Sequence, residues 1–229
     1  EILGKKGDDV RIDWGYFYMA ADKENSSCAT GEGKTLRKSF IDGKLTSSKT
    51  DGSDKLALVR SLGETKKAEG HLLLGYDDLY SIQYFGENLR PYWNRNGNET
   101  IQSQFAKADK EYDAVMDKCA AFDANLMKEA TEVGGRKYAE LCALAYRQAI
   151  AAHKLVEAPN KDLLFLSKEN FSNGSIGTVD ITYPSAPLFL VYNPELAKGL
   201  MNHIFYYSES GKWNKPFAAH DVGTYPLAN

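Results

Sequence analysis

A change in hydrophobic period near residue 98 constrains the fold of this chain more than any other feature of its sequence. Before it, apolar and polar residues alternate, as in Val10–Tyr18 and Tyr80–Phe85, which is typical of half-buried β-strands. After it, apolar residues recur every three or four positions, which is typical of amphipathic helices. The sequence therefore predicts a β-rich part over residues 1–97 and an α-helical part over residues 98–229, an α+β chain.

The first part is expected to form a portion of an antiparallel β-sandwich. Further short strands are predicted at Phe40–Ile41, Leu56–Val59 and Leu72–Leu74, separated by turns rich in Gly, Ser and Lys. The run Thr46–Asp54 has no apolar residue, which indicates an exposed hairpin loop.

The second part is expected to contain helical hairpins. One long helix is predicted from residue 98 to Gly134–Gly135, and a second, with its apolar stripe along Tyr138–His153, is broken by Pro159. Two shorter helices should follow, one from about Pro184 and one opened by Asn193–Pro194. Asn is a favourable N-cap and Pro fits the first turn of a helix.

The charge and hydropathy of the chain exclude several classes of partner. It has 28 Lys and Arg residues against 31 Asp and Glu residues and no basic block, so no nucleic-acid partner is expected. No apolar run approaches the roughly 20 residues that span a bilayer, so no membrane span is expected. Because Glu1–Gly4 resembles neither a translation start nor a signal peptide, we expect the chain to be part of a longer protein.

The cysteines and most histidines are interpreted as structural. Cys28 is expected to be unpaired, as are Cys119 and Cys142, which are also predicted to be buried on helices. His71, His153 and His203 lie in predicted strands or helices and show no metal-ligand spacing. We therefore expect no metal and no cofactor, although a hard cation held by Asp and Asn oxygens stays open.

A first group of polar residues follows Ser167 in a glycine-rich loop. Lys168, Glu169, Asn170 and Asn173 combine an amine, a carboxylate and two amides, and Asp180 follows just before a segment with two prolines. Loops of this kind often carry function. A capped turn formed by Glu169 and Asn170, and a helix N-cap at Asp180, remain equally simple interpretations.

A second group lies near the end of the chain, in Trp213–Pro226. His220 and Asp221 are adjacent there and are flanked by prolines, a glycine and aromatic residues. A carboxylate beside a histidine can shift its pKa and fix its tautomer, but adjacent side chains often point apart. A structural role for His220 therefore stays open.

Motifs of nucleophilic hydrolases are missing from the sequence. No serine is followed three residues later by lysine, and there is no G-x-S-x-G elbow or phosphate-binding loop. The remaining candidates are carboxylates, which can divide the work of general acid and general base when their environments differ.

Six short motifs, in order along nearly the whole chain, resemble the bacterial and fungal glutaminase-type family of the six-hairpin glycosidase superfamily. They are Gly75–Phe85, Leu89–Trp93, Tyr138–Ala149, Lys168–Gly174, Thr178–Asp180 with Tyr183–Pro187, and His220–Pro226. The resemblance implies a β-sandwich followed by an (α/α)6 toroid, here incomplete, in a longer protein that is secreted, periplasmic or exposed at the cell surface. It also implies hydrolysis of L-glutamine to glutamate and ammonia.

The residue chemistry assigns roles within that expectation. Asp180 and Glu169 are predicted to be the catalytic acid and base. The other predicted site residues bind a small-molecule substrate: Lys168, Asn170, Asn173, His220 and Asp221 through polar contacts, and Tyr183, Trp213 and Tyr225 as walls. Two alternatives are a glycoside hydrolase of the six-hairpin type and a non-catalytic structural or carbohydrate-binding part. The remainder of the parent chain is the expected partner.

Overall fold

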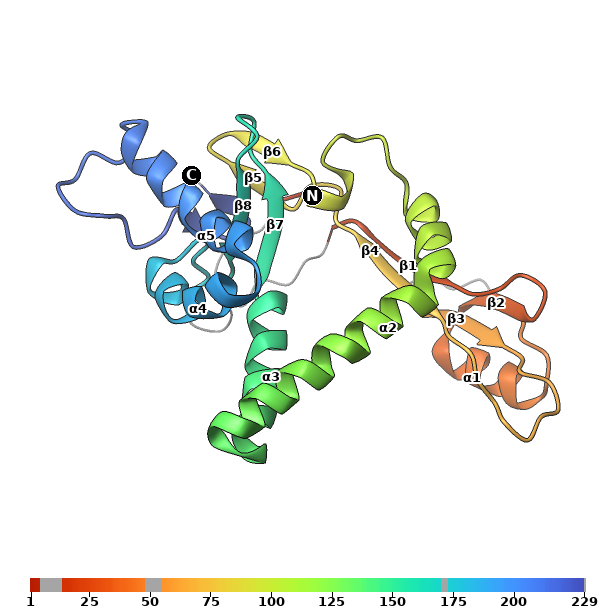
Figure 1. The fold of residues 1–229 in the computed structure, drawn as a ribbon. Coiled ribbons are helices and arrows are strands. Elements are labelled where there is room, and N and C mark those ends of the chain that lie inside the picture. Colours follow the sequence, from red (N-terminus) through yellow and green to blue (C-terminus); the bar gives the residue numbers. More distant parts are fainter. Residues whose placement is uncertain (5–13, 48–54, 170–172, 229) are drawn as a thin grey trace. The chain divides into compact units, whose positions relative to one another are not determined.

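A computed structural model describes residues 1–4, 14–47, 55–169 and 173–228 (Figure 1). It is a mixed α+β structure with small, mostly antiparallel sheets and, in these ranges, five α-helices. The predicted α+β class is confirmed. No helix in these ranges is long and apolar enough to cross a membrane.

The chain divides into two compact units, residues 17–76 and residues 1–16 with 77–229. In the smaller unit, strand β2 (Ser26–Gly31) pairs antiparallel with β3 (Lys55–Arg60), and helix α1 (Gly33–Ile41) buries Leu36. Strand β1 (Tyr16–Ala20) pairs with β4 (Leu73–Asp77). The predicted strands near residues 56 and 72 are thus confirmed.

The predicted strand at Phe40–Ile41 is wrong, because these residues form the last turn of α1. Two apolar residues are too few to define a period, and both side chains are exposed at the helix end. The predicted strand Val10–Tyr18 falls partly, and the loop Thr46–Asp54 largely, outside the described residues.

The larger unit contains a long helical hairpin, as predicted. Helix α2 (Ile101–Gly134) begins with a capping box in which Thr100 Oγ1 accepts from Ser103 N at 3.1 Å. It ends at Gly135, whose φ of 80° is accessible to glycine, and α3 (Arg136–Ala151) follows directly.

The hairpin buries less of its surface than its apolar pattern predicts. Helix α2 buries Ile101 and Leu126, and α3 buries Ala139, while Cys119 is exposed and Cys142 is half-buried. The prediction that both cysteines are buried is therefore wrong. Each helix packs along one narrow stripe and leaves the rest of its apolar face uncovered in the described part of the chain.

The segment after α3 departs from the predicted helix. α3 ends at Ala151, and His153 begins strand β7 (His153–Glu157), which pairs antiparallel with β8 (Leu163–Ser167). The continuous apolar run Leu163–Leu166 suits a strand buried on both faces, a pattern that periodicity does not separate from a helix.

Two helices cover β8. Helix α4 (Val179–Tyr192) starts about five residues earlier than predicted and contains both prolines, and α5 (Pro194–Glu209) begins as predicted, with the Asn193 side chain accepting from Leu196 N. Gly199 of α5 lies so close to β8 that an added Cβ would sit 3.0 Å from Phe165 Cβ. Phe165, Phe189 and Leu200 form the core between them.

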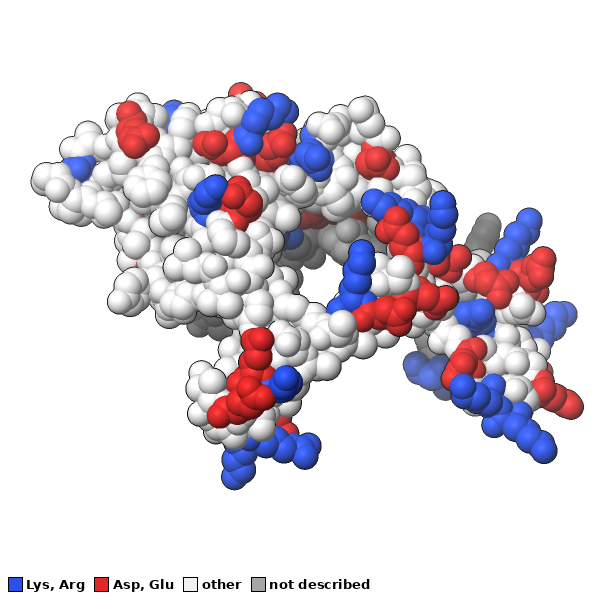
Figure 2. Space-filling view, in the orientation of Figure 1, with Lys and Arg blue, Asp and Glu red and all other residues white. Residues whose placement is uncertain are grey.

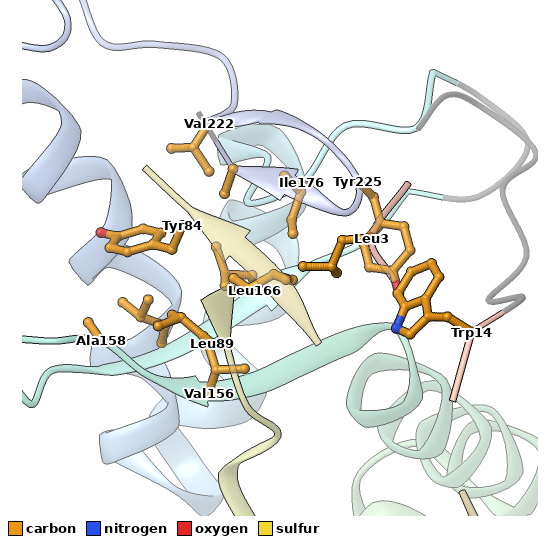
Figure 3. Packing of buried hydrophobic residues seen from close by; sticks show 13 residues of the cluster. Leu3, Trp14, Tyr84, Leu89, Val156, Ala158, Leu166, Ile176, Val222 and Tyr225 are labelled. Carbon is orange, nitrogen blue, oxygen red and sulfur yellow. The ribbon is translucent and has the colours of Figure 1, made fainter. Parts of the chain in front are cut away.

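The main core of this unit joins segments that are far apart in the sequence. A sheet in the order β6-β5-β10-β9 combines β5 (Ile82–Tyr84) and β6 (Glu87–Leu89) with the final strands β9 (Gly223–Thr224) and β10 (Leu227–Ala228). Figure 3 shows Leu166, Ile176, Val222 and Tyr225 packed in one cluster, with Tyr225 beside Trp14.

His203 is one of the buried polar residues of this unit. It is fully buried on α5, and its Nε2 lies 3.0 Å from the carbonyl oxygen of Gly177. Gly177 has a φ of 64°, and a Cβ there would lie 2.6 Å from His203 Nε2. Burial lowers the pKa of His203 to about 4.

Replacement of Gly177 by alanine should destabilise the protein strongly. The left-handed backbone costs an L-residue roughly 1–2 kcal/mol, and the added methyl group must also displace buried His203. Gly211→Ala is the matched control, since Gly211 has a φ of 76° and nothing within 4 Å of its Cβ position. Chemical denaturation should show a larger loss for Gly177→Ala; equal losses would contradict the contact with His203.

Stability should fall as the pH falls from 6.5 to about 4, because in this window the unfolded chain protonates His203 and the folded chain does not. At about 1.4 kcal/mol per pKa unit, the loss attributable to this residue is on the order of 3 kcal/mol. Denaturation of the parent protein and of His203→Gln over this range measures it. Parallel curves for the two proteins would refute the assignment.

Candidate functional site

The two predicted groups of site residues lie side by side in the structure. Backbone hydrogen bonds run from Ile176 N to Gly223 O at 3.0 Å and from Val222 N to Ile176 O at 3.1 Å. A further bond joins Val179 N to His220 O at 2.8 Å. The start of α4, with Asp180 in its first turn, is therefore held against the His220–Asp221 segment.

The loop after β8 is closed by its own backbone. Lys168 and Ile176 form an antiparallel bridge, and Glu169 N donates to Ser175 O at 3.0 Å. Asn173 is exposed, and its Oδ1 accepts from Ser175 N at 2.9 Å. Asn170 lies outside the described residues.

His220 and Asp221 face each other, although they are adjacent in the sequence. His220 Nδ1 lies 2.8 Å from Asp221 Oδ2, and its Nε2 lies 3.7 Å from Asp180 Oδ2. The side chain of His220 is 55% exposed and that of Asp180 is 70% exposed, so solvent and small molecules reach both. Asp180 is not the N-cap of α4, because the cap is Thr178.

Asp221 is fixed by three donors. Its Oδ2 accepts from Ser175 Oγ at 3.1 Å as well as from His220, and its Oδ1 accepts from Gly223 N at 2.9 Å. The sequence reasoning missed Ser175 and Gly223. The Asp-x-Gly sequence is a recognisable turn signal for the contact between Asp221 and Gly223. No local pattern predicts the contact between Asp221 and Ser175, which are 46 positions apart.

Carboxylates determine the electrostatics of this site. The hydrogen bond to Asp221 raises the pKa of His220, and the charges of Asp221, Asp180 and Glu169 raise it further. These carboxylates therefore stabilise the imidazolium form of His220 relative to its neutral form. No group of three or more His, Cys, Asp or Glu side chains in the described ranges has the arrangement of a metal site.

The remaining predicted residues occupy different environments. The ammonium group of Lys168 lies 4.4 Å from the centre of the Tyr225 ring, and Tyr225 itself is fully buried in the core. Tyr183 is 84% exposed on α4. Trp213 is half-buried, with its ring against Tyr207 and its Nε1 bonded to Phe217 O.

A separate apolar groove of about 630 Å³ lies between α2 and α3. It shares no lining residue with the His220 cluster; Phe122, Leu126, Leu144, Tyr146 and Ile150 line most of it. Figure 2 shows a largely uncharged surface over α4, where Leu190 and Val191 are also exposed.

Comparison with known proteins identifies two adjoining family regions. Residues 1–129 match the domain of unknown function (DUF5127), and residues 135–229 match the glutaminase A six helical-hairpin domain. No solved structure matches the chain.

Two curated fungal relatives are similar to this chain. A protein of Aspergillus oryzae named Glutaminase A is 30% identical over 95% of the chain, and one of Arthroderma benhamiae named Probable glutaminase is 32% identical over 45% of it. These matches cover 34% and 12% of the relatives' lengths, so the chain spans about a third of the first.

The geometry predicts how the pKa of His220 responds to its neighbours. Asp221→Asn should lower it more than Asp180→Asn, because Asp221 supplies a hydrogen bond as well as a charge. NMR titration of the labelled imidazole measures both shifts, and His220→Gln identifies the signal. An equal or reversed order would contradict the geometry of the pair.

Proposed function

Because the chain belongs to the glutaminase A-like family, we propose that it carries the acid–base site of a hydrolase that converts L-glutamine to glutamate and ammonia. The observation that carries the proposal is the placement of His220 between Asp221 and Asp180. The charge of Glu169 also raises the pKa of this imidazole. The names of the two fungal relatives support the hydrolase class.

In the proposed reaction, Asp180 or Glu169 removes a proton from water as the water oxygen adds to the side-chain amide carbon of glutamine. The tetrahedral intermediate then collapses, the carbon–nitrogen bond breaks, and the leaving nitrogen takes a proton from the acid partner. His220 Nε2 lies 3.7 Å from Asp180 Oδ2, so protonated His220 can return protons between the two steps through one water or after a small side-chain movement. Glutamate and ammonia account for all the atoms of glutamine and water.

The predicted binding residues take the following roles in the proposal. Lys168, Asn170, Asn173, His220 and Asp221 provide polar contacts, and Tyr183 and Trp213 provide aromatic surfaces. Tyr225 does not, because its side chain is fully buried in the core. Lys168 is the candidate partner for the α-carboxylate of glutamine, for which it must move away from the Tyr225 ring that it covers at 4.4 Å.

A glycoside is the second candidate substrate, and one observation favours it. The charges that raise the pKa of His220 belong to three carboxylates, which repel the α-carboxylate of an amino acid. A neutral sugar has no such charge, and its hydroxyl groups can donate to carboxylate oxygens. Acid and base carboxyl groups are also the usual requirement of glycoside hydrolysis.

The finer architecture is part of the same proposal. We propose that the strands before α2 belong to a β-sandwich and that the helices from α2 onward belong to an (α/α)6 toroid. The groove between α2 and α3, and the exposed Leu141, Tyr183 and Val191, support further helical hairpins of the parent chain as the covering partner. Export from the cytoplasm is proposed from the resemblance to this family.

Substitution of the two carboxylates tests the function. In the natural full-length protein, Asp180→Asn and Glu169→Gln should each lower kcat for ammonia release from glutamine by about 10²–10⁴-fold, the usual worth of a general acid or base. Glu195→Gln is the matched control, since Glu195 is exposed on α5 and pairs with Lys198. A coupled ammonia assay and a reducing-sugar assay with oligosaccharides are run on each protein.

The outcomes separate the alternatives. Reducing sugar without ammonia supports the glycoside, and no turnover of either substrate class by the parent protein supports a non-catalytic part. Full activity in both carboxylate variants removes Asp180 and Glu169 from the mechanism.

A further inference from the structure

Several hydrogen bonds hold Ser175 beside the proposed site. Its side chain is buried, its backbone N donates to Asn173 Oδ1 at 2.9 Å, and its carbonyl accepts from Glu169 N at 3.0 Å. It also bridges Thr224 on the neighbouring segment. The positions of its main chain and Cβ are therefore set by backbone contacts on both sides.

The hydroxyl of Ser175 donates to the same carboxylate oxygen that contacts His220. Asp221 Oδ2 lies 3.1 Å from Ser175 Oγ and 2.8 Å from His220 Nδ1, while Asp221 Oδ1 is bonded to Gly223 N. With donors on both oxygens, the carboxylate cannot rotate without breaking at least one of these bonds. Asp221 is thus kept as an acceptor aimed at Nδ1.

We propose that Ser175 is a positioning residue, which orients Asp221 so that His220 keeps its proton on Nδ1 and presents Nε2 toward Asp180. In neutral histidine one ring nitrogen donates and the other accepts, so a fixed acceptor at Nδ1 leaves Nε2 free to exchange protons. The effect on turnover rests on the proposed function, but the tautomer of His220 does not.

A role for Ser175 as a nucleophile fits the geometry less well. Its hydroxyl is buried and donates to a carboxylate, whereas a serine nucleophile donates to the ring nitrogen of its general base. Nδ1 of His220 is bonded to Asp221 and its Nε2 faces Asp180 at 3.7 Å, so neither ring nitrogen is aimed at Ser175.

The charged groups facing His220 come from three segments. Asp221 is on its own segment, Asp180 is in the first turn of α4, and Glu169 is in the loop after β8. The charges of all three favour the imidazolium, and charge alone does not select between the two neutral tautomers. The directional contact with Asp221, which Ser175 supports, makes that selection.

Removal of the hydroxyl tests this role. In the natural full-length protein with ¹⁵N-labelled histidine, the imidazole shifts above the pKa of His220 report the fraction of neutral ring protonated on Nδ1. We expect the parent protein to favour the Nδ1–H form, Ser175→Ala to lose most of that preference, and Ser175→Thr to restore it. Thr182→Ala is the control, because that hydroxyl donates to the Thr178 carbonyl.

Turnover gives a second, separable readout. If the proposed hydrolysis is correct, Ser175→Ala should lower kcat about 10–100-fold with little change in KM, by analogy with residues that orient the side chains binding a catalytic metal. Its effect should also be much smaller in an Asp221→Asn background, since it acts through that carboxylate. Ser175→Cys, which keeps the volume with a weaker donor, replaces the alanine variant if that variant does not fold.

An unchanged tautomer fraction in a folded Ser175→Ala variant would overturn the proposal. If Ser175→Ala changes the tautomer fraction but the unsubstituted protein does not turn over glutamine, the result would support the positioning role and contradict the proposed hydrolase function. If Ser175→Ala lowers kcat equally in the parent protein and in the Asp221→Asn variant, Ser175 does not act through Asp221.

Discussion

The pairing between residues 174–179 and 220–225 is the interaction on which both the core and the candidate site depend. It places Ile176, Val222 and Tyr225 in the core and, through the same backbone bonds, brings Asp221 to Ser175 and Asp180 to His220. Segments of this length bury little surface by themselves. Their geometry is fixed because β8 and α5 support them from one side, through Gly177 and His203.

Local signals predicted the parts of the fold that local physics determines. The change of period at residue 98, the glycine pair at 134–135 and the Asn193–Pro194 start were all visible in the sequence, since capping and amphipathicity act within a few residues. The strands at 153–167 and 223–228 were missed. Their apolar runs are short, and they become strands through partners far along the chain. The boundary at residue 97, the sandwich and the toroid stay predictions.

The candidate site was likewise predicted only in part from the sequence. The sequence singled out Lys168, Glu169, Asp180 and the His220–Asp221 pair by residue type, but neither the contact between the two groups nor the part played by Ser175 could be read from it. Adjacent side chains need not face each other, and only the tertiary pairing decides that His220 and Asp221 do. Catalytic and binding roles for these residues therefore rest on chemistry and stay proposals.

Within seven residues, the segment from Ala219 to Tyr225 supplies side chains both to the core and to the candidate site. Ala219, Val222 and Tyr225 are buried, while His220 is exposed and Asp221 is bonded beside it. Deletion or insertion of one residue here would move core side chains to positions of the candidate site and site side chains into the core. A change in the length of this segment during evolution would therefore require changes in both the core and the candidate site. Selection on one of them limits the substitutions that the other can accept.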